Sequence, residues 1–303
     1  MRYLDPKNDL TFKKIFGQHP HLLVSFLNAL LPLDAPILSV EYLPHELVPE
    51  IPVLKYSIVD VRCTDQNGRQ FIVEMQMLWT DAFKSRVLFN ASKAYVQQLG
   101  KGKVYESLQP VYSLNLVNET FESTITEFYH HYKIVHQVHP DKILKGLELV
   151  FVELPKFKAK NISERKMQLL WLRFMTEIED NSEEIPEELL QNPIIKEAVD
   201  YLQESGFTKG ELATYNKYWD DISSEMTLMN AAKAEGLAEG REEGREIGRE
   251  EGREEGREKG REEGKKLSII EIAKKAIANG LENGLIKQFT NLSDNEIDNL
   301  RNT

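Results

Sequence analysis

The chain has 303 residues and a mass of 35.0 kDa, which is enough for about two domains. Its 41% hydrophobic and 9% aromatic residues suffice for a packed core and exclude wholesale disorder. No apolar stretch approaches the roughly 18 residues of a membrane span, and no signal-peptide core follows the N-terminus. The single cysteine, Cys63, cannot form an internal disulfide, so we expect a soluble cytoplasmic protein without a membrane partner.

The formal net charge of −11 argues at first against a nucleic-acid partner. Its distribution weakens that argument, because residues 1–110 contain 12 Lys and Arg against 11 Asp and Glu, a balance of +1. The remaining residues therefore carry −12, which is −11 minus +1. The acidity belongs to the later two-thirds of the chain and says little about the partners of the first third.

The first 35 residues predict two helices. Asp9 is the candidate N-cap of a helix over residues 10–16 that ends at Gly17. An apolar helix follows over about residues 22–31.

Strand and helix patterns then alternate. Strands are predicted between residues 53 and 77, on either side of the turn Asp65-Gln66-Asn67-Gly68. The later elements are an amphipathic helix over 81–100, buried strands over 112–117 and 149–154, and helices over 167–178 and 187–203. A short sheet surrounded by helices predicts an α/β core.

Glycine recurs at every fourth position from Gly236 to Gly264, mostly separated by Arg-Glu-Glu triplets. Such a tract has almost no apolar side chains and cannot form a globular core. It is either a self-associating helical stalk, in which small residues let two backbones approach, or a flexible charged linker. Short helices are predicted after it over 269–278, 283–289 and 294–300, the last with Ser293 as its N-cap.

These patterns predict four parts of the chain. They are a core over 1–160, a helical extension over 161–235, the charged Gly-x-x-x stalk or linker over 236–266, and a small helical end-module over 267–303. We expect a homo-oligomer that forms through the C-terminal region.

The hairpin around Gly68 places two carboxylates opposite each other. If the loop has three residues, with Gly68 at positive φ, paired residue numbers sum to 134 and Asp60 faces Glu74. One face then carries Ile58, Asp60, Arg62, Gln70, Ile72, Glu74 and Gln76. The other carries Val59, Val61, Cys63, Phe71, Val73, Met75 and Met77. Only the second face is entirely apolar, so it is expected to be buried and the polar face to lie outside the core. A two-residue loop would instead bury one carboxylate in the core.

Two carboxylates about 5 Å apart across a strand pair repel each other unless a cation lies between them. Mg²⁺ or Mn²⁺ suits such hard oxygen ligands, takes one or two carboxylates and keeps several waters. The ion could position a water molecule and neutralise charge that develops on a phosphate, and Gln76 on the same face could hold that water. The alternative is that Asp60 and Glu74 are ordinary solvent-facing residues of an edge hairpin.

A polar stripe on the predicted helix over 81–100 consists of Arg86, Asn90, Lys93 and Gln97. Together with Lys84 this stripe could follow a phosphate backbone, and Lys13 and Lys14 could do the same. A solvated helix face explains the same pattern.

Several motifs together resemble one nuclease family. Asp60 followed by Glu74-x-Gln76 resembles the split acidic motif of the PD-(D/E)XK nuclease superfamily, with Gln in place of the usual Lys. Flanking blocks resemble its recombination-promoting nuclease (Rpn) branch, also called the PD-(D/E)XK family transposases. These blocks are Asp9-Leu10-Thr11-Phe12-Lys13-Lys14-Ile15-Phe16, Val73-Glu74-Met75-Gln76, Arg86 with Tyr95, Gly102 with Tyr105 and Pro110-Val111, and Phe151-Val152-Glu153-Leu154-Pro155-Lys156-Phe157. The resemblance spans roughly residues 3–235.

The resemblance implies a PD-(D/E)XK restriction-endonuclease-like fold and magnesium-dependent hydrolysis of DNA phosphodiester bonds by metal-activated water, linked to recombination or transposition. Asp60 and Glu74 would hold Mg²⁺ or Mn²⁺, and Gln76 would orient the nucleophile. Asp9 matches an acidic residue on the first helix of related nucleases and would complete the site, unless it only caps its helix. The residues expected to bind DNA are Lys13, Lys84, Arg86 and Lys93.

Gln76 is the main departure from the superfamily pattern. A neutral amide cannot supply the positive charge that Lys offers to a developing phosphorane, so slow turnover is expected. The Rpn branch uses Gln routinely, so an inactive enzyme does not follow. Two alternatives stay open. One is a non-catalytic DNA-binding or protein-interaction module that keeps the nuclease fold, and the other is a transposase-associated factor that cuts DNA only with a partner.

Overall fold

The computed structural model describes residues 1–48, 56–100, 102, 104–159 and 166–302. Its contacts divide the chain into two compact units, unit 1 over residues 1–226 and unit 2 over residues 227–303. Residues 53–55, where the predicted strand region begins, lie outside the described residues. No helix within the described ranges is both long and apolar enough to cross a membrane.

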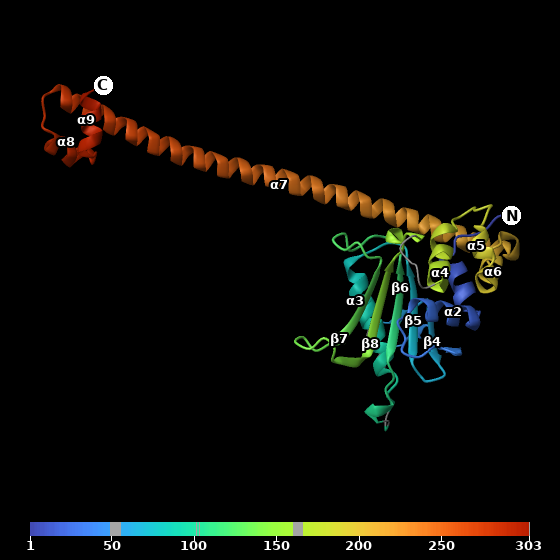
Figure 1. Cartoon of the computed structure of the whole chain (residues 1–303). Helices are drawn as coiled ribbons and strands as arrows, with labels where there is room; N and C mark the ends of the chain where they lie inside the picture. The colour runs from blue at the N-terminus through green and yellow to red at the C-terminus, as the bar shows by residue number, and fades with distance from the viewer. Residues whose placement is uncertain (49–55, 101, 103, 160–165, 303) are drawn as a thin grey trace. The chain divides into compact units, whose positions relative to one another are not determined.

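Unit 1 is built on a mixed six-stranded sheet with the strand order β1-β4-β5-β6-β8-β7 (Figure 1). Its strands are β1 Val40–Tyr42, β4 Val61–Asp65, β5 Gln70–Gln76, β6 Val111–Val117, β7 Tyr129–Val135 and β8 Ile143–Glu153. Strands β5, β6 and β8 run parallel, whereas β1–β4, β4–β5 and β7–β8 pair antiparallel. A separate two-stranded sheet pairs β2, Glu46–Leu47, with β3, Ser57–Ile58. The mixed α/β class predicted from the sequence is confirmed.

The helices are α1 Asp9–Phe16, α2 Pro20–Leu30, α3 Asp81–Val96, α4 Lys166–Glu177, α5 Glu187–Leu190, α6 Pro193–Asp200, α7 Lys209–Ala278, α8 Asn283–Thr290 and α9 Asp294–Arg301. Short 3₁₀ turns cover Tyr105–Ser107, Leu154–Lys156 and Glu204–Gly206. The predicted helix over 187–203 is interrupted, because Pro193 has no N–H and begins α6 directly after its N-cap, Asn192. The predicted helix over 269–278 is the end of α7, since the helical backbone continues through the glycine tract.

The prediction that Asp9 caps the first helix is wrong. Asn8 is the N-cap, and its side-chain oxygen accepts a hydrogen bond from the Leu10 N–H at 3.0 Å. Asp9 is the first helical residue, where a carboxylate interacts favourably with the positive end of the helix dipole. The Asp9 carboxylate therefore does not cap the helix.

Helices cover both faces of the sheet. On one face, α1, α2, α4 and α6 pack against strand residues such as Val61 and Val73, and the rings of Phe16 and Trp171 lie 5.6 Å apart in this layer. On the other face, α3 places small residues such as Ala91 against Ile72. The result is an α/β/α arrangement in which the sheet is buried on both sides.

The polar face of the hairpin, expected outside the core, is covered by α3. Glu74 is 6% exposed and Arg62 is 8% exposed. The prediction fails because α3 presents polar as well as small side chains to the sheet, and Asn90 on α3 donates a hydrogen bond to Glu74. A polar strand face can be buried where the covering helix supplies hydrogen-bond partners.

The strand that was expected to continue through Asp60 bends there. The β4–β5 ladder begins with the pair Val61 and Val73, and Asp60 lies between β3 and β4. Val59 therefore packs with Ile72 on the α3 side of the sheet. The alternating pattern predicts that Val59 shares a face with Val61, and this prediction is wrong.

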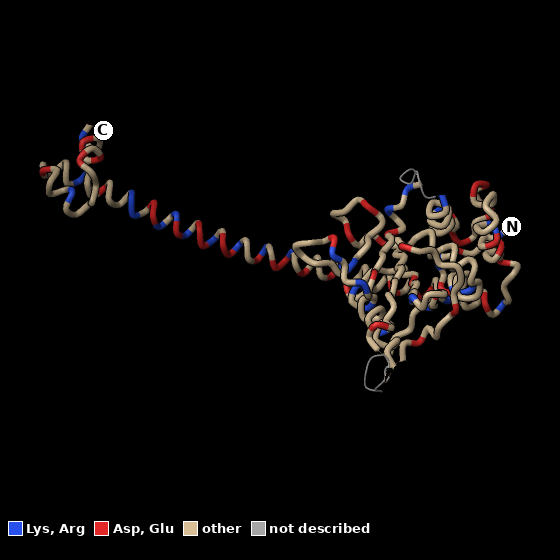
Figure 2. The backbone as a smooth tube through the Cα atoms, turned by 60° about the horizontal axis from the view of Figure 1, so that its bottom comes forward, with Lys and Arg blue, Asp and Glu red and all other residues tan. Residues whose placement is uncertain are grey.

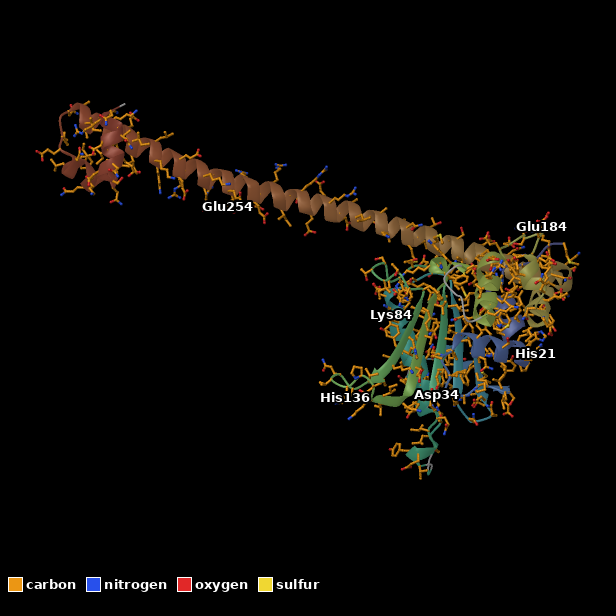
Figure 3. The ribbon with its side chains drawn as sticks, in the orientation of Figure 1. His21, Asp34, Lys84, His136, Glu184 and Glu254 are labelled. Carbon is orange, nitrogen blue, oxygen red and sulfur yellow. The ribbon has the colours of Figure 1, made fainter. Side chains whose placement is uncertain are left out.

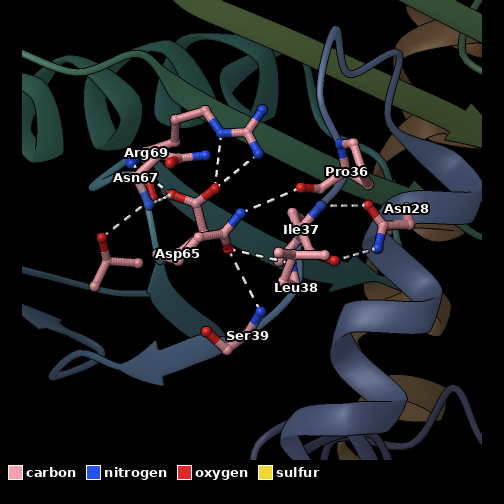
Figure 4. A network of polar contacts seen from close by, with 10 residues as sticks. Asn28, Pro36, Ile37, Leu38, Ser39, Asp65, Asn67 and Arg69 are labelled. Atoms are coloured by element: carbon pink, nitrogen blue, oxygen red, sulfur yellow. Dashed lines mark hydrogen bonds and ion pairs between the residues drawn. The ribbon is translucent and has the colours of Figure 1, made fainter.

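The turn of the hairpin fixes the pairing of β4 with β5. Every pair in this ladder has residue numbers that sum to 134, and Gly68 has a φ of 79°, both as predicted. The Asp65 carboxylate accepts hydrogen bonds from the Asn67 N–H at 3.0 Å and the Arg69 N–H at 2.9 Å (Figure 4). Its Oδ2 also lies 2.7 Å from Arg69 Nη2, and the Gln66 side chain ties the turn to residues 36–39.

Unit 2 contains the later part of α7 together with α8 and α9. A small buried core forms from Ala273, Ala276, Ile286 and Ile297. Ser293 caps α9 in a capping box with Glu296, so the predicted cap is confirmed. Basic and acidic residues follow one another along α7 (Figure 2).

Removing the Asp65 carboxylate should destabilise unit 1. The Asp65 side chain is fully buried, so Asp65→Ala would leave the Arg69 guanidinium without its partner and should lower the free energy of unfolding by about 3–5 kcal/mol. The matched control is Asp34→Ala. The Asp34 side chain is 90% exposed in its ion pair with Lys145, and its loss should change stability by no more than about 0.5 kcal/mol. Urea denaturation of both variants tests this, and equal losses would contradict it.

Candidate active site

Asp60 and Glu74 come together because the bend before β4 turns Asp60 towards β5. Asp60 Oδ2 accepts a hydrogen bond from the Met75 N–H at 2.8 Å. Since Met75 directly follows Glu74, this bond holds the two carboxyl groups near each other. The Asp60 side chain is 23% exposed and the Glu74 side chain is 7% exposed, so Asp60 is partly buried and Glu74 is almost enclosed.

The surroundings of this pair make its double negative charge costly. Burial raises the pKa of Glu74 to about 7, and the negative charge of Asp60 adds to this effect. Burial also raises the pKa of Asp60, and the Met75 N–H and the Lys13 ammonium only partly offset it. Titratable groups that burial and a like charge perturb in this way are typical of functional sites.

Helix α3 contributes two residues that contact Glu74 directly. Asn90 Nδ2 donates to Glu74 Oε1 at 3.1 Å, and Arg86 Nη2 lies 3.6 Å from Glu74 Oε2. Arg86 also donates to Gln76 Oε1 at 2.6 Å, while Gln76 Nε2 donates to the Leu78 carbonyl at 2.6 Å. Gln76 is thereby held between β5 and α3, two residues along the strand from Glu74.

Helix α1 supplies a third carboxylate and a cation. Lys13 Nζ lies 2.6 Å from Asp9 Oδ1 and 3.9 Å from Asp60 Oδ1. The lysine thus connects the first helix to the strand pair. Asp9 lies close enough for its charge to contribute to the raised pKa of Asp60.

The other basic residues predicted to bind DNA lie in different settings. Arg86 has a half-exposed side chain beside Glu74 and Gln76. Lys84 is exposed near the start of α3, with its Nζ 4.8 Å from the centre of the Phe121 ring (Figure 3). Lys93 instead reaches inward, and its Nζ donates to the Leu47 carbonyl at 2.6 Å. All four residues of the predicted stripe therefore contact the protein, since Asn90 is buried and Gln97 Nε2 donates to the Val48 carbonyl at 2.9 Å.

Two residues near the site have roles that the sequence pattern does not reveal. Asn90 belongs to the predicted polar stripe, but only the packing of α3 on β5 shows that it contacts Glu74. Tyr218 on α7 lies within the electrostatic range of Asp9 and Asp60, whose charges add to burial in raising the pKa of its hydroxyl. About 140 residues separate Tyr218 from Glu74 in the sequence, and no local motif marks it.

The donor set fits a divalent cation that keeps much of its water shell. The hairpin region supplies two carboxylates, and burial, more than the nearby negative charges, raises the pKa of each above its ordinary value. Within the described part of the chain, no group of three or more acidic, histidine or cysteine side chains is arranged to hold a metal. Mg²⁺ usually binds through one or two carboxylates and several waters, so Asp60 and Glu74 match its requirement.

Comparison with known proteins identifies the chain at the level of its family. Neither the curated proteins nor the solved structures that were compared with it include a significant match. The sequence profile described as PD-(D/E)XK nuclease family transposase matches residues 6–227. This range contains both candidate carboxylates, Gln76, all of α3 and the segments of α1 and α7 that approach them. The chain therefore belongs to the PD-(D/E)XK nuclease family transposases.

Proposed function

We propose that the protein is a Mg²⁺- or Mn²⁺-dependent endonuclease that hydrolyses phosphodiester bonds in DNA during recombination or transposition. Membership of a nuclease family supports hydrolysis of a nucleic acid in general. The observation that carries the finer proposal is the convergence of Asp60 and Glu74 from paired strands, beneath a helix that removes Glu74 from water.

In this proposal Asp60 and Glu74 hold the cation, and Asp9 completes the acidic site from α1. The bound ion would supply Lewis acidity and a water molecule of lowered pKa. Gln76 is positioned to orient that water through its amide, which Arg86 and the Leu78 carbonyl hold in place. Arg86 and Lys13 are the cations nearest the carboxylates described here, and they would stabilise negative charge that develops on the phosphate.

Arg86 compensates for the absence of a lysine at position 76. Gln76 carries no charge, but the Arg86 guanidinium lies 2.6 Å from its Oε1. The positive charge that the superfamily pattern places on the strand is therefore supplied from α3. For DNA contacts we propose Lys13 at the site and Lys84 near the start of α3, because the side chains of both are accessible. We assign Lys93 a structural role in the same region, since it is bonded to the Leu47 carbonyl.

Cleavage should depend on both carboxylates as one unit. Asp60→Ala and Glu74→Ala should each reduce magnesium-dependent nicking of plasmid DNA on the order of a thousandfold or more, because either change leaves one acid to fix a strongly hydrated cation. The double variant should lose little more, and Gln76→Ala should lose less than either. EDTA should abolish cleavage by the wild type, and Mg²⁺ or Mn²⁺ should restore it.

The control for this test is purification of the wild type and the variants by one protocol. Equal cleavage by the wild type and Asp60→Ala would show that the activity is a contaminant or lies elsewhere. DNA binding by the wild type without any cleavage would favour the alternative of a non-catalytic module that keeps the nuclease fold.

The stability of the metal-free protein should report the cost of ionising Glu74. Its pKa of about 7 lies above the ordinary value of 4.5, so ionisation costs stability progressively as the pH rises from about 4.5 and fully above 7. Glu74→Gln should therefore raise the free energy of unfolding in EDTA by about 2–3 kcal/mol at pH 8.5 and by much less at pH 4.5.

Exposed Glu41 supplies the control, and Glu41→Gln should change stability by at most about 0.5 kcal/mol at either pH. Adding Mg²⁺ at pH 8.5 should stabilise the wild type and not Glu74→Gln, because only the wild type keeps both ligands. A stability difference between Glu74→Gln and the wild type that is equal at both pH values would contradict the assignment of this carboxyl.

The proposal also includes the location and assembly of the protein. Cys63 is buried and free, which agrees with a reducing, cytoplasmic compartment. We further propose that α7 is a self-associating stalk over residues 236–264. Each interior glycine costs a helix about 1 kcal/mol relative to alanine, and ion pairs such as Lys259 with Glu255 are exposed and contribute little. A side chain at any of these glycines would meet nothing within 4 Å in the single chain, so their surface is free for a second copy.

Deleting everything after Lys233 should lower the mass of the assembly in light scattering while circular dichroism still reports a folded unit 1. A quadruple change of Gly240, Gly244, Gly248 and Gly252 to alanine separates the two hypotheses for this tract. Alanine strengthens the helix but prevents close approach of two backbones, so the stalk hypothesis predicts more helix and weaker association. An unchanged mass after both changes would support a plain linker.

A further inference from the structure

A hollow of about 820 Å³ lies directly beside the candidate active site. It is formed by the segment around β3 and by the first half of α3. The residues that matter for its chemistry are Tyr56, Ser57, Ile58, Arg86, Phe89 and Asn90. Arg86 and Asn90 also contact Glu74, so any molecule that fills the hollow lies next to the proposed metal ligands.

Two polar atoms on the wall of this hollow lack hydrogen-bond partners among the described residues. They are Asn90 Oδ1 and Ser57 Oγ, and both atoms are buried. Asn90 is 1% exposed, and its Nδ2 is already committed to Glu74. A buried carbonyl oxygen without a partner costs free energy, and an N–H that reached Asn90 Oδ1 from the hollow would remove that cost.

Part of the remaining wall is formed by large apolar side chains that are exposed. Phe89 is 44% exposed, Tyr56 is 45% exposed and Ile58 is 57% exposed. An apolar wall next to an unsatisfied acceptor suits a flat ring that carries N–H groups on its edge. A nucleobase has both properties, since its faces stack on aromatic side chains and its edge donates hydrogen bonds.

We propose that this hollow binds an unpaired nucleobase of the DNA strand whose backbone lies at Asp60 and Glu74. The inference rests on the proposed function and extends it to the class of substrate. A base inside a duplex is stacked on both faces and paired along its edge, so it cannot reach the wall of a protein pocket without leaving the helix. The preferred substrate is therefore DNA with an unpaired base, such as a bulge, a mismatch or a single strand.

The experiment compares two fluorescently labelled duplexes that differ only in one bulged base. Binding is measured by anisotropy in EDTA, with the full-length Glu74→Gln protein as background so that cleavage does not interfere. This background should bind the bulged duplex about tenfold more tightly than the paired duplex, which corresponds to one base–aromatic stack. Adding Phe89→Ala should abolish the preference, and Phe89→Trp should retain it.

Leu88→Ala in the same background is the matched control. Leu88 is 50% exposed on the same helix as Phe89 but does not line the hollow, so the preference for the bulged duplex should remain. Equal affinity for both duplexes, or the same loss in Leu88→Ala and Phe89→Ala, would overturn the base pocket. In that case magnesium-dependent cleavage of paired DNA by the wild type would leave the proposed function standing. Absence of both DNA binding and cleavage would overturn the two together.

Discussion

The negative charge that Asp60 and Glu74 bring together in a partly buried place is the constraint on which the candidate site depends. A fold that buries two acids together has to hold each of them by a specific contact, and here these are the Met75 N–H for Asp60 and Asn90 and Arg86 for Glu74. A slip of one residue between β4 and β5 would move Glu74 to the opposite face of the sheet and break these contacts. The Asp65–Arg69 turn at the far end of the hairpin prevents that slip, so a structural ion pair determines the geometry of the site.

Helix α3 has three functions that are usually divided among several elements. Its small residues pack on Ile72, its Asn90 and Arg86 contact Glu74, and its Phe89 lines the hollow beside them. Under the proposed function, Arg86 also supplies the charge that Gln76 lacks. Because one helix both covers the sheet and contacts Glu74, polar side chains interrupt its apolar face. A helix that only covered the sheet would not require a buried asparagine.

Local sequence patterns predicted the hairpin register and the positive φ of Gly68, because turn length and strand pairing next to the turn are properties of a few adjacent residues. Patterns of the same kind failed where a choice depended on a distant partner. These patterns predicted that the Glu74 face lies outside the core and that Val59 lies beside Val61. Both predictions are wrong because the hairpin sequence contains no information about the helix that packs on it. The prediction of Asp9 as the helix cap was wrong for a smaller reason, because Asn8 is an equally good cap one residue earlier.

By itself the sequence determined the α/β class and the family to which the chain belongs, and it selected Asp60 and Glu74 as the candidate acids, since these follow from residue types at short spacings. Only the tertiary structure decided which groups surround those acids. Lys13 from α1, Asn90 and Arg86 from α3 and Tyr218 from α7 approach the same pair from separate parts of the chain. Their positions follow from how the helices pack on the sheet, and that packing is a property of the whole buried core that no local pattern contains.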